Sequence, residues 1–97
     1  MNNHALFNAA SLIAKNNLSD KVISITVTWD EEISKLTVTY FVDGSVSEEE
    51  QDLCELTLAE LLAEFSDIQL ADGQCVSHVH SELVEQGQQK GLVYHRP

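Results

Sequence analysis

The sequence predicts a single α+β domain, residues 1–97, in which two helices cover one face of an antiparallel sheet built on a central hairpin. Its length suits one domain. Residues 22–42 hold two runs of alternating apolar and polar residues joined by a short polar turn, which is typical of an antiparallel hairpin. Residues 4–16 and 48–65 instead repeat apolar residues at helical spacing. The apolar face of a hairpin needs cover, and two amphipathic helices supply it.

The first helix is expected at about residues 4–16. Asn2 or Asn3 can cap its start, and the pair Asn16-Asn17 ends it. Its apolar residues recur every three or four positions. They are Leu6, Ala9, Ala10, Ile13 and Ala14.

The hairpin pairs a strand at residues 22–29 with a strand at residues 34–42, through the turn Asp30-Glu31-Glu32. Alternation gives each strand one face suited to burial. The faces expected to be buried carry Ile23, Ile25, Val27 and Trp29, and Leu36, Val38, Tyr40 and Val42. The opposite faces carry Val22, Ser24, Thr26 and Thr28, and Lys35, Thr37, Thr39 and Phe41.

The second helix opens at Ser47 and has the strongest helix signal. Ser47 and Glu50 form a capping box, and glutamates in the first turn suit the helix dipole. A second pair of this kind, Thr57 with Glu60, leaves a break near Leu56 open. The side facing the core is expected to carry Cys54, Leu58, Leu61, Leu62 and Phe65.

The last third of the chain supplies one or two further strands. Residues 68–70 are strand-like, and residues 92–95 form a short final strand. Residues 72–86 fit either structure, because residues 75–81 could form a strand while five positions between 76 and 84 have helical spacing. Those positions are Val76, Val79, His80, Leu83 and Val84.

Charge is the main functional signal. The net charge is -11, and between Leu36 and Gln89 there are twelve acidic residues and no Lys or Arg. The twelve are Asp43, Glu48, Glu49, Glu50, Asp52, Glu55, Glu60, Glu64, Asp67, Asp72, Glu82 and Glu85. Domain surfaces normally mix both signs, and a one-signed surface repels itself. A basic partner explains this surface most economically, and a merely solvated acidic face is the alternative.

Several classes fit the composition poorly. Nucleic acids and anionic membranes attract clustered basic residues, and the chain has five Lys and Arg in total. No apolar run reaches the length of a membrane span, and residues 1–4 do not open a secretory signal. We therefore expect a cytoplasmic protein, in which the two cysteines, Cys54 and Cys75, stay reduced.

No metal, cofactor or catalytic site is predicted. Cys75, His78 and His80 match no standard zinc spacing, and neither a helix nor a strand points all three to one side. Residues 43–49 hint at a calcium loop but lack the glycine and the final glutamate of an EF-hand. A domain of this size has little room for a substrate cleft, so we expect no enzyme activity.

The expected recognition surface is an acidic band along the second helix with a cluster at each end. The two strands span about 25–30 Å at ~3.3 Å per residue, and the helix returns over that distance, so Glu64 and Asp67 come back near the hairpin turn. Leu53 and Leu56 fall outside the core-facing arc and either widen the core or form an apolar anchor ringed by carboxylates. The candidate partner-binding residues are Asp30, Glu31, Glu32, Asp43, Glu48, Glu49, Asp52, Leu53, Leu56, Glu60 and Glu64.

Three stretches of the second half resemble small immunity proteins of bacterial toxin systems, of the colicin and contact-dependent growth inhibition kinds. They are Ser47-Glu48-Glu49-Glu50, Leu58-Ala59-Glu60-Leu61-Leu62-Ala63-Glu64-Phe65 and Gly91-Leu92-Val93-Tyr94-His95-Arg96. The resemblance implies a cytosolic inhibitor that binds a toxin domain, often a basic nuclease, and has no catalytic residue. Carboxylates suit that partner, because electrostatic steering can raise association rates to ~10⁸–10⁹ M⁻¹s⁻¹. The alternative is an acidic adaptor or subunit that docks on a non-toxic basic protein.

Overall fold

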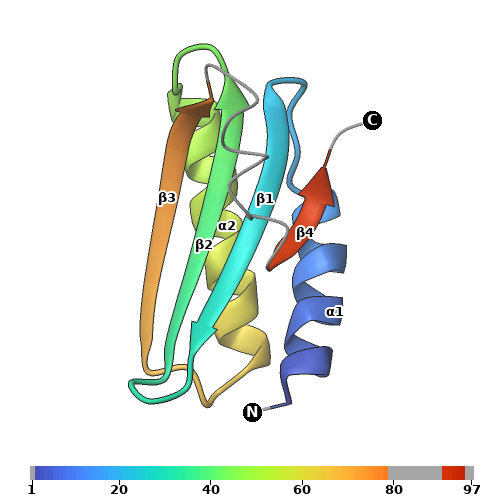
Figure 1. Cartoon of the computed structure of the whole chain (residues 1–97). Coiled ribbons are helices and arrows are strands. Elements are labelled where there is room, and N and C mark those ends of the chain that lie inside the picture. The colour runs from blue at the N-terminus through green and yellow to red at the C-terminus, as the bar shows by residue number, and fades with distance from the viewer. Residues whose placement is uncertain (1, 79–90, 96–97) are drawn as a thin grey trace.

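The computed structural model describes residues 2–78 and 91–95, which form one layer of helix packed on one layer of sheet (Figure 1). The elements are α1 (Asn3–Lys15), β1 (Val22–Asp30), β2 (Lys35–Asp43), α2 (Glu48–Glu64), β3 (Leu70–His78) and β4 (Leu92–His95). The two helices contact each other and lie on the same face of the sheet (Figure 1). The predicted α+β class, the central hairpin and the two covering helices are therefore confirmed.

The sheet is mixed, whereas we expected an antiparallel one. Its strand order is β3-β2-β1-β4, and β1 is antiparallel to both of its neighbours. β3 runs parallel to β2, because α2 carries the chain back to the end of the sheet where β2 begins (Figure 1). The return is fixed by the backbone N–H groups of Gln69 and Leu70, which donate to the Ser34 carbonyl at 2.9 and 3.1 Å.

A β-bulge at the start of β1 changes which residue faces the core. The pairing register shifts between Val22 and Ser24, so Ile23 is the extra residue of the bulge. Val22 therefore pairs with Val42 and is buried on the helix side of the sheet. Strict alternation had assigned Val22 to the opposite face, and that assignment is wrong.

The core fills the space between the hairpin and the two helices. The predicted inward positions of β2 are all fully buried. The main cluster of buried apolar residues is Leu6, Ala10, Ala14, Val22, Ile25, Val27, Leu36, Val38, Tyr40, Val42, Cys54 and Leu61. Burial of this apolar surface is the main force that holds the helices on the sheet.

The start of α1 is capped as the sequence indicated. The side chain of Asn2 accepts hydrogen bonds from the backbone N–H groups of His4 and Ala5, at 2.9 and 3.2 Å. These two donors would otherwise have no partner in the first turn.

The start of α2 differs from a capping box. Ser47 is the N-cap residue, but its side chain makes no hydrogen bond to the helix backbone. Its hydroxyl instead bonds to the carboxylate of Glu50. The helix then continues without a break through Thr57 to Glu64. The sequence therefore located the start of the helix correctly, while the predicted capping bonds are wrong.

The C-terminal strands are partly as expected. β3 continues to His78, which favours the strand interpretation of residues 75–81 as far as the structure describes them. The helical alternative at Val79–Val84 lies outside the described residues. The predicted final strand is β4 (Leu92–His95), which pairs with β1.

Gly91 enters β4 in a position that admits no side chain. Its φ is +82°, and a Cβ there would lie 2.4 Å from the carbonyl oxygen of Val27. The Val27 N–H donates to the carbonyl of Gly91 at 2.8 Å. Glycine is thus required where this turn meets β1.

Candidate protein-binding surface

The outer face of α2 is acidic along its whole length. Six carboxylate side chains are exposed on it, and the helix contains no Lys or Arg. They are Glu48, Glu49, Asp52, Glu55, Glu60 and Glu64. We call this set the acidic band.

The two predicted end clusters lie at opposite ends of the domain (Figure 1). The hairpin turn, residues 30–32, is exposed and lies at the end of the sheet where α2 finishes. Asp43 is exposed at the other end, where α2 begins. The structure thus brings Glu64 to the end that holds the hairpin turn, as expected.

The leucines of α2 divide differently from the prediction. Leu53 is half-buried and packs against the core, whereas Leu56 is 48% exposed. Leu62 was expected in the core, but it is 40% exposed. The reason is the rotation of the helix, whose buried line runs through Glu50, Cys54, Thr57 and Leu61 and turns Leu62 sideways.

A buried polar network holds α2 against α1 and β2. The hydroxyl of Tyr40 donates to the Asn17 carbonyl at 3.0 Å and shares a 2.6 Å hydrogen bond with the Thr57 hydroxyl. The side-chain amide of Asn17 donates to Thr57 Oγ1 at 3.1 Å and to Glu60 Oε2 at 2.8 Å. Glu60 is therefore both a member of the acidic band and a partner in the contact between α2 and the segment that follows α1.

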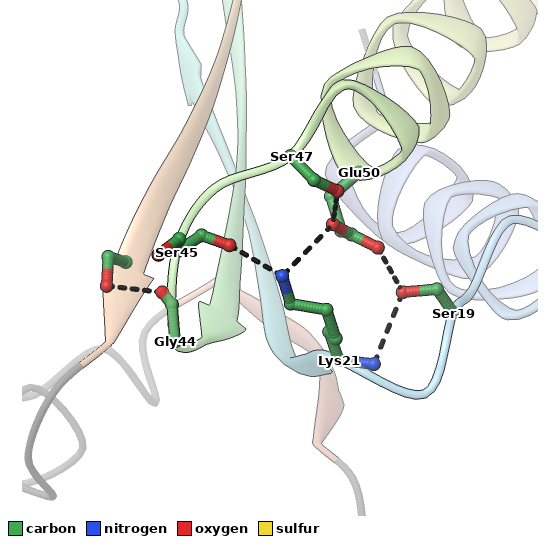
Figure 2. A network of polar contacts seen from close by, with 7 residues as sticks. Ser19, Lys21, Gly44, Ser45, Ser47 and Glu50 are labelled. Carbon is green, nitrogen blue, oxygen red and sulfur yellow. Dashed lines mark hydrogen bonds and ion pairs between the residues drawn. The ribbon is translucent and has the colours of Figure 1, made fainter.

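Glu50 is acidic but does not belong to the exposed surface. Its side chain is 1% exposed and accepts hydrogen bonds from Ser19 Oγ at 2.6 Å and from Ser47 (Figure 2). Lys21 Nζ lies 3.9 Å from Glu50 Oε1 and donates to the Ser45 carbonyl at 2.6 Å (Figure 2). From the sequence, Glu50 was grouped with the acidic residues expected at the surface. Its burial depends on Ser19, which lies 31 residues earlier.

The environment of Glu50 favours its charged form. The hydrogen bond from Ser19, followed by that from Ser47, lowers the pKa of Glu50 below its ordinary value, and Lys21 acts in the same direction. Burial opposes this shift without reversing it. Glu50 is thus an ionised structural group at neutral pH.

Among the described residues, three other groups have raised pKa values, in each case chiefly because they are buried. The pKa of Tyr40 is raised to about 12 and that of Cys54 to about 11. Burial also raises the pKa of Cys75. Both thiols are free and protonated at neutral pH, which is typical of structural cysteines rather than of nucleophiles.

A small groove lies between α2 and β3. Its cavity is about 200 Å³ and is lined by Gln51, Cys54, Glu55, Gly73, Gln74 and Cys75. The groove exists because Gly73 faces the helix, where a Cβ would lie 3.2 Å from the sulfur of Cys54. This volume is below the range of about 300–1,000 Å³ that is usual for small-molecule sites.

The described residues contain no group of three His, Cys, Asp or Glu side chains placed to hold a metal ion. His80, one of the three residues considered for zinc, lies outside that part of the chain. Residues 43–49, which were considered for calcium, form no such group. In the same part of the chain, neither helix has the length and apolar character needed to cross a membrane.

Fold and surface together define a small α+β domain with an acidic helix exposed along one side. The chain belongs to the MafI2 immunity protein family, whose model matches residues 12–97. No match was found among curated proteins. Family membership confirms the resemblance to toxin-immunity proteins, supports an immunity function and implies a cognate toxin as partner. It also suggests an inhibitor that acts without catalysis.

Proposed function

We propose that this protein neutralises a basic toxin domain, a nuclease, by binding it in the cytoplasm through the acidic band and its two end clusters. The observation that carries the proposal is the exposure of six carboxylates on α2, a helix without Lys or Arg. A nuclease surface that binds phosphates is basic, so the two potentials are complementary. Membership in an immunity family supports the toxin as the partner.

The acidic band supplies attraction, and an apolar side chain within it supplies contact. Long-range attraction increases the rate of encounter with a basic partner, which matters when that partner is lethal. Leu56 is exposed and lies among these carboxylates on α2, so it is the apolar anchor that we assign to the interface. Leu53 packs mainly against the core and contributes less to binding.

The experiment is a titration of the purified cognate toxin domain with this protein. We expect toxin activity to disappear at an equimolar ratio, since an inhibitor that acts by binding is consumed one for one. Loss of toxin activity at strongly sub-stoichiometric amounts would reveal turnover and overturn the proposal. Tight binding to a basic protein without any inhibition would instead support an acidic adaptor.

A further inference from the structure

The edge of the sheet formed by β3 is open among the described residues. β3 lies at the end of the strand order, pairs with β2 on one side and has nine residues. Natural proteins protect long edge strands with Lys, Pro or a bulge. Residues 70–78 contain neither Lys nor Pro, and the pairing with β2 is regular throughout. Within the described part of the chain, this edge therefore carries only one of the usual protective features, the charged side chain of Asp72.

The backbone groups of β3 that face outward follow from its register. The N–H of Leu70 donates to Ser34 at the start of the ladder with β2. Backbone N–H groups of alternate residues point to opposite sides of a strand. The N–H groups of Ala71, Gly73 and Cys75 therefore point away from β2. No described strand pairs with this side of β3, so these groups can pair with an added strand.

The helix-facing side chains of β3 and the adjacent flank of α2 form a surface on which a fifth strand could lie. Ala71, Gly73 and Cys75 pair in register with the inward Leu36, Val38 and Tyr40, so they face the helix. All three are small residues. A strand placed next to β3 would lie against the flank of α2 that carries Gln51, Glu55, Leu58 and Leu62 at helical spacing. Two of these, Gln51 and Glu55, line the groove over Gly73.

The charge of this surface indicates which kind of segment would bind there. Glu55 is exposed at the groove, Asp72 is exposed on the opposite face of β3, and α2 offers no basic residue. The 40% exposed Leu62 adds an apolar contact on the same flank. A cavity of about 200 Å³ suits one long side chain, with its methylene groups over Gly73 and its charged end at Glu55.

From this geometry we propose that the cognate toxin docks by adding an extended, basic segment to the edge of β3, with one Lys or Arg side chain in the groove between α2 and β3. This inference rests on the proposed function and specifies the contact through which the toxin binds. Main-chain hydrogen bonds supply affinity in such strand addition, and the side-chain groove supplies selectivity. A second copy of this chain is a poor occupant, because its own β3 edge is acidic as well.

The test is residue-resolved amide hydrogen exchange of the full chain, alone and with an equimolar amount of the inactivated cognate toxin domain. We expect the amides of Ala71, Gly73 and Cys75 to exchange quickly in the free protein and at least about tenfold more slowly in the complex. The amides of Asp72 and Gln74 point toward β2 and serve as internal controls, already protected in the free protein. The proposal would be overturned if the amides of Ala71, Gly73 and Cys75 were already protected in the free protein through self-association.

A pair of matched variants tests the groove. Glu55→Lys and Glu49→Lys change the net charge equally, and both residues are exposed on α2, but only Glu55 lines the groove. We expect both to slow association, and Glu55→Lys alone to raise the dissociation rate, by about tenfold. Equal dissociation rates, or binding and inhibition without protection of the β3 amides, would refute strand addition and leave the proposed function standing. Absence of any binding or inhibition would refute the proposed function itself.

Discussion

The hydroxyl of Ser19 donates to Oε2 of Glu50 at 2.6 Å and so ties the loop before β1 to the first turn of α2 (Figure 2). Glu48 and Glu49, the two preceding residues, are exposed. One run of three glutamates thus contains two surface charges and one buried structural charge. Each has a different consequence when it is changed.

Replacing Glu50 should make the fold less stable and change how its stability depends on pH. The pKa of Glu50 in the folded protein is below its value of about 4.3 in the unfolded chain. Ionised Glu50 therefore contributes its full stabilisation of the fold above that unfolded value, and this stabilisation is lost as the pH falls through the lower folded pKa. Glu50→Gln should lower the free energy of unfolding at pH 7 by about 1.5–3 kcal/mol, the range for a hydrogen bond to a charged group. Urea unfolding at pH 7 and at acidic pH measures both effects.

Glu49→Gln is the matched control, because Glu49 is exposed in the same turn. Its unfolding free energy should stay within about 0.5 kcal/mol of the unmodified protein. Equal stability of the Glu50→Gln and Glu49→Gln proteins at pH 7 would contradict a structural role for Glu50.

Charge reversal in the acidic band should slow association with the toxin. Glu49→Lys with Asp52→Lys should lower the association rate and flatten its dependence on salt, because steering is a long-range Coulomb effect. Stopped-flow association at several ionic strengths measures this, and an unchanged rate would place the interface elsewhere, with the hairpin turn at residues 30–32 as the next candidate. Glu60→Lys is kept separate, because it also removes the 2.8 Å hydrogen bond from Asn17 and should lower the melting temperature.

The two leucines outside the predicted core arc should separate packing from binding. Leu53→Ala should lower the free energy of unfolding by about 1–3 kcal/mol, somewhat less than a fully buried leucine, since Leu53 is half-buried. Leu56→Ala should leave the melting temperature unchanged and weaken toxin binding by about 1–3 kcal/mol, as a hot-spot residue does. Thermal melts and binding isotherms of both variants are needed. Unchanged affinity of Leu56→Ala would remove the apolar anchor from the interface.

Tyr40→Phe should weaken the packing of α2 against β2 and against the segment that follows α1. The hydroxyl it removes bonds to the Asn17 carbonyl and to Thr57, and its loss should cost about 1–3 kcal/mol of stability. The pKa of Tyr40 is raised to about 12, so its contribution is complete below its unfolded value near 10 and is lost as the pH rises toward 12. The Phe variant should therefore lose less stability than the unmodified protein between pH 10 and 12.

Local patterns were sufficient for the elements themselves. Alternation over residues 22–42 identified both strands of the hairpin, and helical spacing located α1 and α2, because burial on one face imposes a period on the sequence. The absence of Lys and Arg from α2 could likewise be read directly, and an exposed helix keeps that charge at the surface.

Relations between distant residues required the tertiary structure. The bulge at Ile23 follows from pairing with β2, and the parallel direction of β3 follows from the return of α2. Whether Glu50 is buried depends on Ser19, and whether Leu62 is exposed depends on how α2 is rotated against the sheet. The sequence by itself determined the order of the helices and strands and the negative sign of the surface charge. Only the packed structure decided which charges and leucines face a partner, because burial is set by neighbours that are far away along the chain.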